Sequence, residues 1–309
     1  MQKILNKIFI QLSLPGSDAD LGSFKLDETF EKGFLRKMMF HKTWGFIGQK
    51  KEALEKYFTA DLIETVNGLR EQNIIKNEVY SDFTEHLAEK IRFIPLKGVY
   101  YLKNIYKDDY SLRFMSDIDI LLKLEDLLEC AELLSAYGFN VPSDADIRQE
   151  LQFRSHITLN GFHKKFPVSI ELHTRPFETD ISIPSCALDD PLFISTVHSV
   201  FHYYTDRFYH FSDWAYIKEK TNDTRSSVKM LETSGFLKNF KYLEKLENIF
   251  KKSGEVPYPF RNFIAKDRVA NTFERFWFWY FIEGKVKTGS GYIAHYLKRE
   301  KHDKTDRSC

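Results

Sequence analysis

The segment RFMSDIDILL, residues 113–122, decides which fold we predict. It is expected to enter a β-strand at Asp117, and in a strand residues two apart point to the same face. Asp117 and Asp119 would then project together, while Ile118 and Ile120 face the core on the other side. Two carboxylates so close repel each other unless a positive charge lies between them. Magnesium, which prefers carboxylate oxygens and substrate phosphates, is the cation we expect there.

The sequence around this strand predicts a small sheet. An apolar run stops at Gly98, and a later helical pattern ends at Gly138, a typical C-terminal cap. Two alternating segments farther on are typical of paired strands joined by the turn GFHKKFP. In chain order we expect a strand at 93–96, a helix at 99–106, a strand at 117–122, a helix at 124–138 and strands at 156–161 and 168–173. This order predicts an α/β core built on a mixed sheet.

Helical sequence flanks the predicted core on both sides. Before residue 92, apolar positions recur at spacings of three and four with charge between them. There, Thr59 or Asp61 would begin one helix and Ser81 or Asp82 another. After about residue 190 we expect helices at 191–206, 211–220 and 229–252, and an aromatic core or subunit contact at 268–284. The predicted fold class is α/β (α+β), with helical regions at 1–92 and 181–309 around a core at 93–180.

Composition argues against several classes of protein. The 309 residues include 45 basic and 44 acidic side chains, so a net charge of +1 gives no global reason to expect nucleic acid as a partner. No apolar run is long enough for a transmembrane helix, and the start of the chain is a poor secretory signal. The three cysteines, at positions 130, 186 and 309, have no metal-site spacing. We therefore expect a cytoplasmic protein with no membrane partner.

Polar residues near the two aspartates extend the candidate site. Glu171, in the last predicted strand, supplies a third carboxylate unless it only belongs to the polar face of a half-exposed strand. Arg113 and Ser116 precede the aspartates in a polar loop. Lys97 and Gly98 lie at a strand-to-helix junction, where glycine and the helix N-terminus allow a phosphate to approach the backbone. For Arg113 and Lys97 the alternative is a solvated surface charge.

Several other polar residues have two readings. His173 shares the face of Glu171 and either contacts a metal or acceptor or is a hydrogen-bonded wall residue. His198 and His202 are four residues apart on a predicted helix, but no third ligand is evident, which favours packing over zinc binding. Asp213 either caps the next helix or faces the cleft, and the helix-flanking interpretation is favoured. The basic turn at 163–165 is expected to be a solvated hairpin tip.

The pattern LKGVYYLKNIY…LRFMSDIDILL…LLSAYGF…IELH resembles a family of uncharacterised bacterial nucleotidyltransferase-like proteins. The family signature is LKG…R..DiDLL…ELH, within the superfamily of polymerase-β-like nucleotidyltransferases, and the resemblance covers about residues 94–175. One departure concerns the phosphate loop. The superfamily has Gly-Gly-Ser or Gly-Ser after the first strand, whereas this chain has Lys97-Gly98-Val99 and lacks the serine.

The resemblance implies a reaction and roles for the candidate residues. An NTP and an acceptor would give the nucleotidyl-acceptor and pyrophosphate. Asp117, Asp119 and Glu171 would be the catalytic residues and would hold two magnesium ions. Residues that would bind the substrate and its phosphates are Lys97, Gly98, Arg113, Ser116 and His173.

Two other functions stay open beside this one. The missing serine favours an inactive relative that binds nucleotide or a partner without chemistry. A toxin that transfers nucleotides to RNA would need a basic groove, which the net charge does not support. The sequence leaves the acceptor, the preferred NTP and the oligomeric state undetermined.

Overall fold

The computed structural model of the chain describes residues 2–17, 27–107, 109–152, 154–177, 185–201 and 208–253. At its centre is a four-stranded sheet in the order β1-β2-β4-β3. β1 pairs antiparallel with β2, β2 pairs parallel with β4, and β4 pairs antiparallel with β3, so the predicted mixed sheet is confirmed. The strands are β1 (Ile94–Leu96), β2 (Ile118–Leu121), β3 (His156–His163) and β4 (Phe166–His173).

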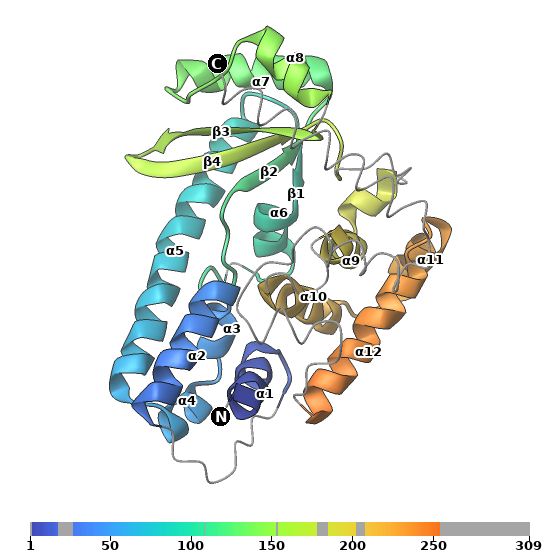
Figure 1. Cartoon of the computed structure of the whole chain (residues 1–309). Coiled ribbons are helices and arrows are strands. Elements are labelled where there is room, and N and C mark those ends of the chain that lie inside the picture. The colour runs from blue at the N-terminus through green and yellow to red at the C-terminus, as the bar shows by residue number, and fades with distance from the viewer. Residues whose placement is uncertain are drawn as a thin grey trace, which may run out of the picture.

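Helices cover both faces of the sheet. Figure 1 shows α7 (Leu124–Ala136) and α8 (Asp144–Leu151) across one face and α6 (Lys97–Asn104) against the other. The helix α8 was not predicted, because Ile147 is its only buried residue and its sequence therefore lacks an apolar stripe. Its start is marked by Ser143, whose side chain accepts a hydrogen bond from the backbone of Asp146.

Within residues 2–17 and 27–92, the described part of the N-terminal helical region, there are five helices, of which α5 is the longest. As expected, Thr59 caps α5, and its side chain accepts a hydrogen bond from the backbone of Leu62. The predicted second start at Ser81 or Asp82 is wrong, because α5 continues for 29 residues and Ser81 is buried in its interior. The bounds are α1 (Gln2–Ser13), α2 (Glu28–His41), α3 (Trp44–Gly48), α4 (Lys51–Tyr57) and α5 (Ala60–Ala88).

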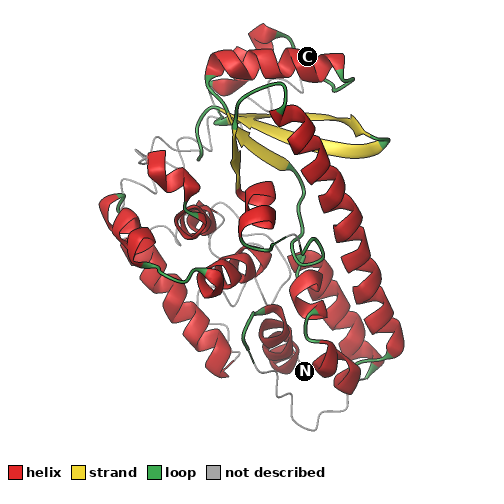
Figure 2. Ribbon diagram, turned by 180° about the vertical axis from the view of Figure 1, so that it is seen from behind, coloured by secondary structure: helices red, strands yellow, loops and turns green. Residues whose placement is uncertain are grey.

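The C-terminal helical region contains the helices expected after residue 190. Figure 2, the view from behind, shows them on the side of the molecule opposite α5. The bounds are η1 (Ser185–Asp189, a 3-10 helix), α9 (Pro191–Phe201), α10 (Phe208–Lys220), α11 (Arg225–Thr233) and α12 (Leu237–Ser253). His202, the aromatic segment 268–284 and Cys309 lie outside the described residues. Among the helices that are described, none is both long and apolar enough to span a membrane.

Candidate active site

Three carboxylates meet on one face of the two central strands of the sheet, β2 and β4. β2 and β4 run parallel in a register that places Asp119 beside Glu171, and Asp117 lies directly before β2. Ile118 and Ile120 are fully buried on the opposite face, as the alternation predicted. Asp117, Asp119 and Glu171 all line one cavity of about 140 Å³. The parallel pairing thus assembles the predicted acidic set from segments about 50 residues apart.

Lys97 is the positive partner of Asp119. Lys97 begins α6 with a left-handed backbone (φ 44°), and its Nζ atom lies 2.9 Å from Oδ1 of Asp119. Burial by itself lowers the pKa of Lys97, but the charges of Asp119 and Glu171 outweigh it and leave that pKa raised. Only 13% of the lysine side chain is exposed, so Lys97 is not the solvated surface charge considered as the alternative.

Asp117 carries the negative charge that the site does not neutralise. Burial and the charges of Asp119 and Glu171 raise its pKa to about 6, against the smaller opposing effects of Lys97 and of the Ser116 hydroxyl. That hydroxyl donates to Oδ2 of Asp117 over 2.9 Å. A group of three carboxylates that leaves one of them short of positive charge fits the binding of divalent cations through oxygen ligands.

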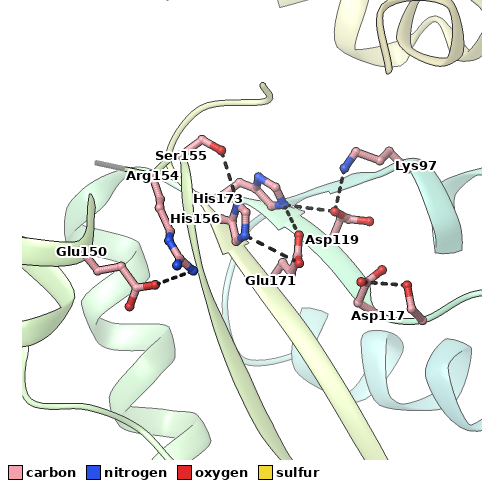
Figure 3. A network of polar contacts seen from close by, with 10 residues as sticks. Lys97, Asp117, Asp119, Glu150, Arg154, Ser155, His156, Glu171 and His173 are labelled. Atoms are coloured by element: carbon pink, nitrogen blue, oxygen red, sulfur yellow. Dashed lines mark hydrogen bonds and ion pairs between the residues drawn. The ribbon is translucent and has the colours of Figure 1, made fainter. Parts of the chain in front are cut away.

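His173 lies between two of the carboxylates. Its Nε2 atom is 3.0 Å from Oδ1 of Asp119 and 3.3 Å from Oε2 of Glu171 (Figure 3). Burial lowers the pKa of His173, yet the hydrogen bonds to both carboxylates raise it overall. These contacts agree with the hydrogen-bonded wall residue considered from sequence, and they also put a nitrogen ligand next to Glu171.

Arg113 is buried, not exposed in a polar loop. Its Nε atom donates to Oδ2 of Asp213 over 3.0 Å, and its guanidinium group lies 5.4 Å from the ring centre of Tyr101. Asp213 also accepts a hydrogen bond from the hydroxyl of Tyr106. The expected capping role of Asp213 is wrong, because the residue lies inside α10 and balances the buried charge of Arg113. Arg113 still lines the cavity beside Asp117, so its predicted contact with phosphate stays a prediction.

Gly98 allows Arg113 and Met115 to pack against the start of α6. A Cβ atom at this position would lie 3.1 Å from Sδ of Met115 and 3.2 Å from Nη1 of Arg113. Such contacts are tighter than normal side-chain packing, so a larger residue would displace both neighbours. The structure therefore supplies a reason for glycine here that is independent of any phosphate.

A polar stripe on α5 holds the loop that leads to Asp117. Nδ2 of Asn77 donates to the backbone oxygens of Tyr110 and Arg113 over 2.9 and 2.7 Å. The Tyr80 hydroxyl donates to the backbone oxygen of Ser116 over 3.0 Å. These bonds satisfy backbone groups in a segment without secondary structure of its own and fix where β2 begins.

Several residues near the carboxylates were not expected as site residues. The cavity is also lined by Phe114, Tyr209 and His210. His156 lies on β3 with its Nε2 atom 3.6 Å from Oε1 of Glu171. The place of His156 could have been predicted from the turn GFHKKFP. A tight hairpin at this turn pairs His156 with His173. The α10 residues gave no local signal, since their approach depends on tertiary packing.

The other singled-out residues have mainly packing roles. His198 lines the cavity and packs against His210 with ring centres 4.9 Å apart, in line with the favoured packing role. At the predicted hairpin tip, Lys164 has a left-handed backbone and forms an ion pair of 2.9 Å with Asp82 on α5. The hairpin tip is therefore bound to α5 through an ion pair and is more than a solvated turn.

Comparison with known proteins identifies the family. The family described as "Uncharacterised nucleotidyltransferase" matches residues 47–223, which is more than half of the chain. The match includes α5, the whole sheet and α10, so it covers every element that lines the carboxylate site. Comparisons with the curated proteins and with the solved structures found no match. The chain therefore belongs to this nucleotidyltransferase family and is an enzyme of the transferase class.

Proposed function

We propose that the protein transfers a nucleoside monophosphate from an NTP to an acceptor and needs magnesium to do so. The observation that carries this proposal is the convergence of Asp117, Asp119 and Glu171 on one cavity next to Lys97. Bound magnesium ions would stabilise the charge that develops on the attacking and leaving oxygens. The three carboxylates would hold those ions, with Glu171 also placed to accept the proton of an acceptor hydroxyl.

The basic residues at the cavity would bind the polyphosphate. Lys97 balances Asp119 in the metal-free protein, and its ammonium group becomes available for phosphate when cations neutralise the carboxylates. Arg113 is oriented by Asp213 and packs against Gly98, so its Nη1 atom lies at the start of α6. The α6 N-terminus adds backbone N–H groups that favour an anion. Together these groups can replace the serine that the chain lacks.

The cavity size indicates how much of the substrate it holds. A volume of about 140 Å³ is well below the roughly 300–1,000 Å³ of sites that enclose a small molecule. It can enclose metal ions and phosphate groups, while the nucleoside would lie at its mouth. Phe114 and Tyr209 line the cavity and offer aromatic faces on which a base can stack.

Calorimetric titration with each NTP, with and without magnesium, tests this proposal. We expect binding that requires magnesium in the wild-type protein. Asp117→Asn and Asp119→Asn should each weaken it at least about tenfold, or about 1.4 kcal/mol, because each removes a metal ligand. The matched control is Glu132→Gln, which alters an exposed carboxylate on α7, on the far face of the sheet.

The possible results separate the transferase from a nucleotide-binding protein without chemistry. If NTP binding requires magnesium in the wild type and in Glu132→Gln, and is lost in the two aspartate variants, the result supports the transferase site. Tight NTP binding that ignores both magnesium and the aspartates would favour a nucleotide-binding protein without chemistry. No NTP binding under any condition contradicts the proposal.

A further inference from the structure

A pair of histidines borders the carboxylate site. The antiparallel register of β3 and β4 sets His156 directly opposite His173, and their ring centres are 4.8 Å apart. Glu171 lies two residues before His173 and shares its face. One oxygen of Glu171 is 3.6 Å from Nε2 of His156, and the other is 3.3 Å from Nε2 of His173. Figure 3 shows the two imidazoles and this carboxylate turned toward one another.

We propose that His156, Glu171 and His173 bind one divalent transition-metal ion, such as Zn²⁺, at a site next to the carboxylates proposed for magnesium. Each residue offers a ligand atom, and the three atoms lie within 4.8 Å of one another. Two donors that are each about 2.0–2.1 Å from a tetrahedral ion are about 3.3 Å apart. The observed separations of 3.3 and 3.6 Å, which join the histidines to the two different oxygens of Glu171, are near this value, and a small movement of the side chains would bring the three ligand atoms around one ion.

The donor atoms select the kind of metal. Two imidazole nitrogens and one carboxylate suit Zn²⁺ and similar ions, whereas Mg²⁺ prefers oxygen ligands and keeps its water. The hydroxyl of Ser155 lies 3.4 Å from Nδ1 of His156, on the side of the ring away from Glu171. A bond from the outer nitrogen of a histidine is what orients the inner nitrogen toward a metal.

The site is accessible and is linked to the carboxylates through Glu171. The side chains of His156 and Glu171 are 15% and 21% exposed, whereas that of His173 is only 4% exposed. Three protein ligands leave a fourth position for water or substrate. An ion held here would draw Glu171 toward the histidines and away from the magnesium set. Zinc should therefore lower the affinity for magnesium and NTP, although zinc binding itself does not depend on the proposed transfer reaction.

Titration of the magnesium-free, full-length protein with Zn²⁺, and with Co²⁺ followed by visible absorbance, tests the site. We expect one ion per chain. His156→Gln should weaken binding at least about tenfold, since loss of even an outer-shell partner costs about 10–100-fold. His156 is the first choice because it is partly exposed, so its replacement should leave the fold intact. Circular dichroism and the melting temperature of the variant check this.

Three further variants locate the ion. His86→Gln, on the exposed face of α5, should bind zinc as wild type does. His198→Gln tests the other histidine pair, His198 and His210, and should also retain zinc. Asp117→Asn should keep zinc binding while losing magnesium-dependent NTP binding, so the two proposals can fail separately. Wild-type zinc affinity in His156→Gln, or a loss that follows His198→Gln instead, would overturn the inference.

Discussion

At the scale of single residues, Asp117 and Asp119 show how the surroundings of a carboxyl group set its pKa. They are two residues apart and share a face, but their pKa values move in opposite directions. Burial raises both, yet Lys97 and His173 bind Asp119 and hold its pKa well below the usual value. Among the residues that the structure describes, the Ser116 hydroxyl is the hydrogen-bond partner of Asp117, and burial together with the charges of Asp119 and Glu171 raises its pKa to about 6. In the metal-free protein, the carboxylate of Asp117 is therefore repelled by the charges of Asp119 and Glu171.

This repulsion predicts that Asp117→Asn stabilises the metal-free protein at pH 7. A folded-state pKa of about 6, above the unfolded value of 3.8, means that the folded state binds the proton more tightly. The ionised carboxylate of Asp117 therefore destabilises the folded state by its full amount above pH 6. This destabilisation disappears as the pH falls toward 4. We expect Asp117→Asn to gain about 1–3 kcal/mol at pH 7, or several degrees in Tm, and almost nothing at pH 4.

Melting curves of both proteins in a chelator, recorded from pH 4 to pH 8, measure the effect. Comparison of variant and wild type at each pH cancels the titration of the carboxylates that do not interact with Asp117. Added magnesium should raise the Tm of wild type more than that of Asp117→Asn. An equal Tm for the two proteins at pH 7 would contradict the predicted repulsion.

At the scale of elements, α5 acts as a support for the loop that leads to Asp117. Its polar positions recur at spacings of three and four, which places them along one side of the helix. Five residues of this stripe hydrogen-bond to the segment 110–116, namely Arg70, Asn73, Asn77, Tyr80 and Ser81. A polar stripe in the protein interior is unusual unless its groups find partners, and here loop groups accept hydrogen bonds from Nη2 of Arg70, from Nδ2 of Asn73 and Asn77 and from the Tyr80 hydroxyl. The helix thereby positions Asp117 from outside the sheet.

Asn77→Ala tests this support. Asn77 is fully buried, and its loss leaves the backbone oxygens of Tyr110 and Arg113 without their donor. We expect a destabilisation of about 1–3 kcal/mol in denaturant unfolding, together with weaker NTP binding because the loop before Asp117 relaxes. Asn67→Ala, at an exposed position of the same helix, is the control and should change neither property. Unchanged NTP binding in Asn77→Ala would show that the loop is held by other contacts.

At the scale of the whole molecule, an aromatic cluster joins the two helical regions beneath the site. Phe9 of α1 packs against Phe34 of α2 and against Phe208 of α10, with ring centres 6.4 and 5.6 Å apart. Phe208 in turn packs against Phe250 of α12 at 5.6 Å. Since α10 also carries Asp213, this cluster connects the N-terminal residues to Arg113 at the candidate site. The aromatic content of the sequence is thus used in part to fix α10.

Phe9→Ala tests whether the regions unfold together. Phe9 is completely buried, so the substitution should cost about 3–5 kcal/mol. If the helical regions and the sheet form one cooperative unit, near-UV and far-UV circular dichroism should report a single, earlier unfolding transition. Phe162→Ala, at a ring that is 65% exposed on β3, should change stability by less than about 0.5 kcal/mol. Two separate transitions in Phe9→Ala would instead indicate independent domains at the predicted boundaries.

The sequence by itself determined most elements and the face on which each side chain lies. Strand alternation placed Asp117 and Asp119 together, and helical spacing located the flanking helices, because both periods are local properties of the backbone. It missed α8, which lacks an apolar stripe, and it divided α5, because Ser81 and Asp82 are typical of helix starts. Glu171 was expected near the aspartates from strand order and the resemblance to a family.

Only the tertiary structure decided which of these residues meet. The parallel register of β2 and β4 sets Glu171 beside Asp119, and the packing of α10 brings Asp213 to Arg113 across 100 residues of chain. The antiparallel register of β3 and β4 places His156 opposite His173. The physical reason is that side-chain periodicity is local, whereas strand register and helix docking are set by the burial of surfaces that are distant in the chain.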